Sequence, residues 1–220
     1  MTAQIQDCYK HKRKKYDLVA LSKDIGFDPR DYGMEPHMSS TACWRGYWCD
    51  YEITDTQLLL KNLYLFNSED KYPPIMGVGP SPVTYHDAQC CYMKDGKTIC
   101  EVQPYPDHMG HRLYKNINMP LPYTGKILLG SGFIRDYYIH MGFQRSWAYR
   151  RLMEFVLEDG VVKQINDLSE DAKKQRQAIK RGTKLPSTKP GSADDIEKFV
   201  TDSFSLDYKD KAWWLSDDYD

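Results

Sequence analysis

Histidine and aspartate side chains gather in one short segment, residues 107–111 (Asp-His-Met-Gly-His), with a His-Asp pair upstream at residues 86–87. Imidazole and carboxylate groups are suitable ligands for a divalent transition-metal ion. His108 and His111 are three residues apart and could meet one ion if the segment formed a helical turn. Two prolines before the segment and a glycine within it predict a loop instead. We therefore expect exposed or hydrogen-bonded loop histidines, and a metal-dependent or small-molecule site using His86, His108 and His111 is the alternative.

Nucleophilic catalysis has weaker candidates. Ser131 stands between two glycines, but the Gly-x-Ser-x-Gly elbow is missing from this pattern. Cys43 or Cys49 could form a Cys–His pair with His140, although a free cysteine is more often a small buried apolar residue. The sequence also has no phosphate-binding or dinucleotide-binding glycine motif. We therefore expect no catalytic residue and no cofactor, and a binding protein rather than an enzyme.

An arginine among aromatic residues marks the best candidate binding segment. Arg45 lies between Trp44 and Tyr47, and an arginine in such a setting can stack on a ring or pair with a carboxylate such as Glu52. A structural ion pair between Arg45 and Glu52 is favoured over a ligand clamp. The candidate binding residues are Trp44, Arg45, Tyr47, Glu52 and His140.

The pattern of apolar and aromatic residues predicts a mainly β (α+β) fold. Alternating or β-branched runs are bounded by turn residues such as Asp95-Gly96 and Asp159-Gly160. The core at residues 40–165 is expected to be an antiparallel sheet or a barrel-like meander. Its expected strands are residues 43–53, 58–66, 91–93, 98–102, 125–129, 136–143, 150–157 and 161–165.

Two polar segments flank this core. Residues 1–39 hold a basic run at residues 10–15, which predicts a solvated tail or a helix start more than a nucleic-acid site, because the whole chain is nearly neutral. Residues 166–220 predict a charged helical C-terminal arm, with helices at about residues 167–181 and 192–200. Trp213 and Trp214 are expected to pack on this chain or on a partner.

The numbers of charged residues and cysteines in the whole chain narrow the class of protein. Thirty basic and thirty-one acidic residues give a net charge of −1, so no global field would concentrate nucleic acid. No export signal or membrane-spanning apolar stretch is apparent, which predicts a cytoplasmic protein whose six cysteines are thiols. Cys90 and Cys91 would face opposite sides of a strand, and a zinc site at these cysteine spacings is not expected.

Three blocks carry a resemblance to a known family. Residues 40–47 (S-T-A-C-W-R-G-Y), 51–53 (Y-E-I) and 58–60 (L-L-L) resemble the opening of a family of uncharacterised bacterial proteins with the pattern S-T-x-x-W-R-G-Y, W-E-I, L-Y-L. Residues 123–127 and 137–143 resemble its second block, followed by a strand like residues 158–162. Tyr51 departs from the family's tryptophan, and the chain after Asn166 has no counterpart.

The resemblance implies a binding function rather than a reaction. The family is associated with bacterial accessory loci, including those of secreted toxins and their immunity proteins, and it assigns no catalytic residue. Abundant tyrosine and tryptophan, seventeen and five residues, suit interface anchors. We therefore expect a non-enzymatic bacterial cytoplasmic protein that binds another protein, such as a toxin, as an immunity or accessory factor.

Overall fold

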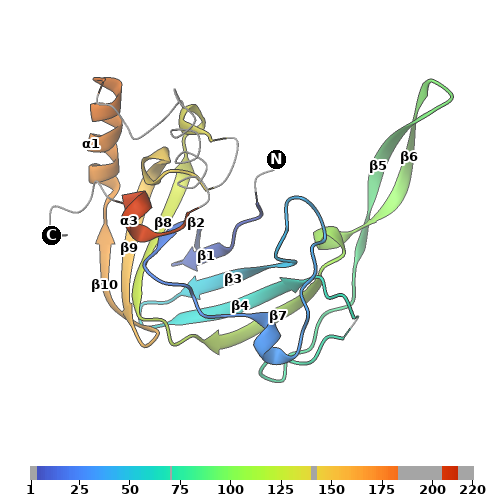
Figure 1. Cartoon of the computed structure of the whole chain (residues 1–220), viewed down its shortest axis with the longest axis horizontal. Helices are drawn as coiled ribbons and strands as arrows, with labels where there is room; N and C mark the ends of the chain where they lie inside the picture. The colour runs from blue at the N-terminus through green and yellow to red at the C-terminus, as the bar shows by residue number, and fades with distance from the viewer. Residues whose placement is uncertain (1–3, 70, 140–142, 183–204, 213–220) are drawn as a thin grey trace. The chain divides into compact units, whose positions relative to one another are not determined.

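The computed structural model of the chain describes residues 4–69, 71–139, 143–182 and 205–212 (Figure 1). Contacts divide the chain into two compact units. Unit 1 combines Met1–Phe27, Asp50–Lys61 and Asn118–Asp220, and unit 2 combines Asp28–Cys49 and Asn62–Ile117. Each unit gathers segments that are distant in the sequence.

Strands make up most of the regular structure, which confirms the mainly β prediction. The larger sheet has the strand order β10-β9-β8-β2-β1-β3-β4-β7 and does not close into a barrel among the described residues. It is mixed, because β1 pairs with β3 in parallel, whereas β1–β2, β2–β8, β8–β9 and β9–β10 are antiparallel. Of these antiparallel pairs, the sequence predicted β9–β10. Its strands are β1 (Cys8–His11), β2 (Lys14–Leu21), β3 (Tyr47–Ile53), β4 (Leu58–Leu65), β7 (Arg112–Pro120), β8 (Gly125–Phe133), β9 (Tyr149–Glu158) and β10 (Val161–Asp167).

The basic run near the N-terminus lies in a β-hairpin, so the predicted tail or helix start is wrong. Lys12 and Arg13 join β1 to β2 with positive φ angles of 47° and 66°, as a two-residue turn between twisted strands requires. Tyr9 and Tyr16 are opposite each other in the hairpin and are buried. Four consecutive exposed basic residues, Lys12 to Lys15, conceal this short apolar pattern in the sequence.

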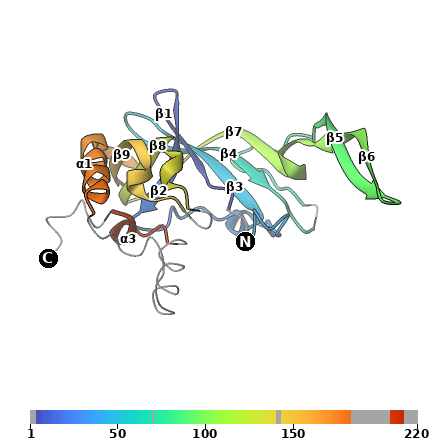
Figure 2. The ribbon, with the colours of Figure 1, turned by 90° about the horizontal axis from the view of Figure 1, so that it is seen from above.

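Packing in unit 1 depends on a tyrosine ring and a helix. A Cβ on Gly130 in β8 would come within 2.4 Å of the buried Tyr149 ring of β9, so only glycine allows this close approach. The helix predicted at residues 167–181 is confirmed as α1 (Ser169–Lys180), which lies beside β9 (Figure 2). Ala172 of this helix is buried. Arg176 of α1 donates from Nη1 to the carbonyl oxygens of Trp147 (3.0 Å) and Tyr149 (2.6 Å). These bonds fix the helix to the chain that enters β9.

The strand predicted at residues 136–143 does not form in its described part. Two 3₁₀ turns, η3 (Arg135–Tyr137) and η4 (Ser146–Ala148), connect β8 to β9. Because β8 already pairs with β2 and β9, the aromatic segment between them has no free strand to join. The helix predicted at residues 192–200 and the Trp213–Trp214 pair lie outside the described residues, whereas a short helix, α3 (Tyr208–Ala212), is described.

Unit 2 contains loops, parts of β3, β4 and β7, and a separate two-stranded sheet. Its further elements are η1 (Pro29–Tyr32), β5 (Tyr85–Lys94), β6 (Lys97–Pro106) and η2 (Asp107–Gly110). The strand expected to begin at residue 43 begins only at Tyr47. Gly46 has a φ of +77°, and a Cβ there would meet the backbone oxygen of His37 at 2.4 Å. The chain therefore turns at residues 43–46, where the aromatic composition had predicted a strand.

Candidate interaction surface

The sheet of β5 and β6 is a long hairpin, which we call the ribbon (Figure 1). Its strands pair without a register shift from Lys94 opposite Lys97 to Tyr85 opposite Pro106. Asp95 and Gly96 form the turn with φ angles of 50° and 73°, as the Asp-Gly sequence predicts. The strands are much longer than the expected segments 91–93 and 98–102. The additional paired positions hold polar residues and prolines, which do not predict a strand.

One face of the ribbon exposes large apolar side chains. Residues opposite each other in an antiparallel pair share a face, and the faces alternate along each strand. The first face, which we call the cystine face, contains Tyr85, Asp87, Gln89, Cys91, Met93, Thr98, Cys100, Val102, Pro104 and Pro106. Tyr85, Met93 and Val102 are 64%, 66% and 69% exposed. Only Asp87 is charged on this face, so the three apolar side chains dominate it.

The opposite face, which we call the tyrosine face, is more polar and makes contacts within itself. It contains His86, Ala88, Cys90, Tyr92, Lys94, Lys97, Ile99, Glu101, Gln103 and Tyr105. The Tyr92 hydroxyl donates to Glu101 (3.3 Å), and the His86 ring lies edge-on to Tyr105 at 5.9 Å between centroids. Tyr92 and Tyr105 are 42% and 46% exposed, less than the three apolar side chains of the cystine face, so the cystine face is the better candidate for binding.

A disulfide joins the two strands of the ribbon, so the prediction that all cysteines are thiols is wrong. Cys91 and Cys100 lie opposite each other with 4.1 Å between their Cα atoms. Cys90 is a free thiol and pairs in register with Glu101, which confirms that the two adjacent cysteines face opposite sides. Because an isolated two-stranded hairpin is marginal in water, this bond stabilises a ribbon that has little other packing.

Hydrogen bonds at Asp107 hold the base of the ribbon. The Thr84 hydroxyl donates to one carboxylate oxygen, and His86 Nδ1 lies 2.7 Å from the other. The Asp107 amide also donates to the Thr84 carbonyl oxygen (2.8 Å). The hydrogen bonds from Thr84 and His86 hold the pKa of Asp107 below its usual value. His86, a candidate metal ligand, therefore braces the ribbon in this structure.

The second candidate metal ligand, His111, is a buried and hydrogen-bonded side chain. Its Nδ1 lies 2.8 Å from the His108 carbonyl oxygen, so Nδ1 carries the proton and donates it. Its Nε2 then accepts from Ser39 Oγ (3.2 Å), and Cys43 Sγ lies 3.8 Å from the same nitrogen. Burial lowers the pKa of His111, which favours this neutral form. The Cys–His pair thus joins Cys43 to His111, and both residues are only 2% exposed, which shields the thiol from a reactant.

The candidate ligands do not assemble into a metal site. Within the described part of the chain, no three or more His, Cys, Asp or Glu residues group so as to hold a metal ion. The ring of His108 instead lies edge-on to Tyr64 at 4.8 Å, and the ring of His111 lies 4.4 Å from Trp48. In this structure, the loop histidines act as packing and hydrogen-bonding groups.

Arg45 stacks on a neighbour, and the predicted ion pair with Glu52 is wrong. Its Nε donates to the Tyr47 carbonyl oxygen (2.7 Å), and its guanidinium lies 4.6 Å from the Tyr47 ring centroid. Glu52 pairs instead with Lys61 (3.1 Å). Trp44 is 51% exposed in the turn before β3, so it remains a candidate contact residue. His140, the last of the predicted binding residues, lies outside the described residues.

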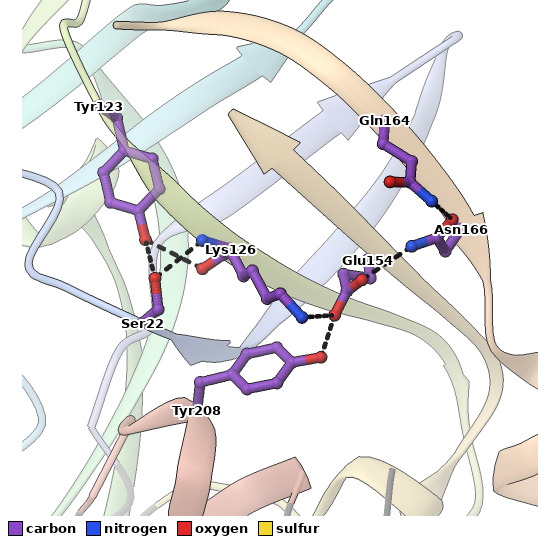
Figure 3. Close-up of polar contacts among 7 residues, drawn as sticks. All are labelled: Ser22, Tyr123, Lys126, Glu154, Gln164, Asn166 and Tyr208. Carbon is purple, nitrogen blue, oxygen red and sulfur yellow. Dashed lines mark hydrogen bonds and ion pairs between the residues drawn. The ribbon is translucent and has the colours of Figure 1, made fainter. Parts of the chain in front are cut away.

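Unit 1 contains a buried polar cluster that the sequence analysis missed (Figure 3). Glu154 on β9 is 5% exposed, and it accepts hydrogen bonds from the Tyr208 hydroxyl and from Asn166 Nδ2 (2.8 Å). Lys126 Nζ lies 3.5 Å from the same carboxylate. The sequence signal for this cluster was a charged residue, Glu154, at an inward position of a strand. Its partner Tyr208 on α3 is 54 residues away, so the sequence does not connect the two. The cluster ties α3 to the sheet and satisfies a buried charge.

Comparisons with protein-family models, with curated proteins and with solved structures found no match. The resemblance to the bacterial family with the S-T-x-x-W-R-G-Y pattern therefore stays a prediction. No helix within the described ranges combines the length and the apolar character that crossing a membrane requires.

Proposed function

We propose that the protein binds another protein through the cystine face of the ribbon. The observation that carries this proposal is the exposure of Tyr85, Met93 and Val102 on one face of a disulfide-joined hairpin. Apolar side chains gathered on one exposed face typically mark an interaction site, and aromatic and methionine side chains are enriched in the core of such sites. A bacterial immunity or accessory factor that binds a toxin is the specific form suggested by the sequence resemblance.

The charges of the ribbon favour a protein over a nucleic acid. Two-stranded ribbons can enter the major groove of DNA, but they do so with an excess of basic groups. Here Lys94 and Lys97 at the tip are offset by Asp87, Asp95 and Glu101. A near-neutral apolar face suits a protein surface, where burial of apolar area supplies the affinity.

The disulfide bears on where this binding takes place. The sequence predicted a cytoplasmic protein, and disulfides persist mainly in oxidising compartments. We propose that the ribbon acts where the Cys91–Cys100 bond survives, so the cytoplasmic location stays a prediction that this bond disfavours. Alkylation of the protein inside its native cells, followed by mass spectrometry, measures directly whether the two cysteines are bonded.

A pair of lysine substitutions tests the proposed face. Val102→Lys places a charge on the cystine face, and Gln103→Lys places the same charge on the tyrosine face one residue further along β6. Partner proteins are captured from native cells by the tagged full chain and quantified for each variant. We expect Val102→Lys to reduce capture at least about tenfold, because a charge buried in an apolar interface costs more than about 1.4 kcal/mol. An equal effect of the two variants, or no effect of either, contradicts the proposal.

A further inference from the structure

The backbone groups that point outward from the two edges of the ribbon belong to the residues of the cystine face. In a hairpin with a two-residue turn, the residues flanking the turn exchange both backbone hydrogen bonds, and bonded and non-bonded pairs then alternate. Lys94 and Lys97 form the first bonded pair, so the cystine-face residues occupy the non-bonded pairs. The N–H and C=O groups of these residues point away from the ribbon. Pro104 and Pro106 fall on such positions, where the ribbon itself needs no N–H group.

Two prolines interrupt the edge of β6 near the base of the ribbon, whereas the edge of β5 is open along its whole length. Prolines at residues 104 and 106 remove two outward donors from β6, which is a common protection of edge strands. β5 has no proline and no bulge along its ten residues. Its outward groups belong to Tyr85, Asp87, Gln89, Cys91 and Met93, all of which are exposed. No backbone hydrogen bond found among the described residues reaches this edge from outside the ribbon.

We propose that a second copy of the chain adds to the outer edge of β5, so that two ribbons form one sheet in the order β6-β5-β5-β6. Antiparallel pairing about Gln89 is self-complementary. It sets Tyr85 of one copy against Met93 of the other, and Asp87 against Cys91, with no like charges opposed. The two-fold arrangement uses the same surface on both copies. The prolines of β6 remove donors from both outer edges of this four-stranded sheet, which disfavours the addition of further copies.

This dimer goes beyond the proposed function and would strengthen it. Strand addition places the two cystine faces on the same side of one continuous sheet, because side chains alternate in phase across paired strands. The exposed apolar surface is then doubled and presented by a wider sheet than one ribbon provides. Two linked copies of one surface also bind a dimeric partner with avidity.

Matched proline substitutions test the edge. Gln89→Pro removes an outward N–H from β5, and Val102→Pro removes the outward N–H of its partner residue on β6. Neither substitution removes a hydrogen bond within the ribbon. Sedimentation equilibrium of the full chain should show a dimer, with a dissociation constant raised at least about tenfold by Gln89→Pro and changed less than about twofold by Val102→Pro. A monomeric wild-type chain, or equal effects of the two substitutions, overturns the proposal.

A photo-crosslinking residue covers the case in which proline disturbs the ribbon. Benzoylphenylalanine at position 89 should join two copies covalently, whereas the same residue at position 103, on β6, should not. Crosslinked dimers from position 103 alone contradict pairing through β5. The Val102→Lys variant separates this proposal from partner binding, because it should lose partner capture and still sediment as a dimer. A dimer that captures no partner contradicts only the proposed function.

Discussion

Removal of the Cys91–Cys100 disulfide measures how the ribbon is held together. The bond joins residues nine positions apart, and chain entropy for a closed loop of about ten residues gives about 2.7 kcal/mol of stabilisation. β5 and β6 are exposed along most of their length, so little packing offsets the loss of this bond. In the double variant Cys91→Ser/Cys100→Ser, we expect ribbon amides to exchange with solvent about a hundredfold faster.

Hydrogen exchange followed by mass spectrometry reports this change segment by segment. The protein is diluted to favour the monomer, and peptides that cover β5 and β6 are compared with peptides that cover β8 and β9. Cys90→Ser is the matched control, because Cys90 is a free thiol beside the disulfide. Its ribbon should exchange as in the wild-type chain, and β8 and β9 should be unaffected in both variants. Ribbon exchange that changes less than about threefold in the double variant would refute the reasoning, because packing would then hold the strands.

Three further changes test unit 1 and the buried histidine. Gly130→Ala should lower the free energy of unfolding by about 1–3 kcal/mol in urea, because its Cβ would lie 2.4 Å from a buried ring, whereas Gly79→Ala has open space and should change it by less than about 1 kcal/mol. Tyr208→Phe should cost about 1.5–3 kcal/mol, because Glu154 loses a donor in a buried site. Burial lowers the pKa of His111, so the unfolded chain binds more protons than the folded chain, and the free energy of unfolding should fall as the pH drops below 6.5. His111→Gln should make the free energy of unfolding depend less on pH, which denaturation at pH 7 and at about pH 5 would measure.

Local signals predicted the features that a few neighbouring residues determine. The Asp95-Gly96 turn and the helix after residue 167 depend on turn chemistry and on helix periodicity, and both form. The disulfide was also predictable. The Asp-Gly turn fixes the register, and Cys91 and Cys100 each lie three residues beyond the lysines that flank it. The assumption of a reducing compartment concealed this pairing.

Features that depend on distant parts of the chain could not be found in this way. Basic residues fill the exposed centre of the N-terminal hairpin at residues 12–15, and its buried tyrosines are recognised as core residues only once β1 lies beside β3. No sequence pattern near Glu154 predicts its contact with Tyr208. Arg45 and Glu52 are close in sequence, but a turn at Gly46 places the arginine outside the strand that holds the glutamate.

The disulfide and the exposed apolar face have a common physical explanation. A strand normally gains stability by burying one face against the core of its own chain, and the cystine face does not do so, since Met93 and Val102 remain 66% and 69% exposed. A covalent bond between the strands replaces part of that stabilisation without covering the apolar side chains. A connecting loop without a binding role would need neither ten paired residues in each strand nor such a bond. The combination therefore favours an arm that is preorganised for a partner, because a stiff ribbon loses less conformational entropy on binding than a flexible loop.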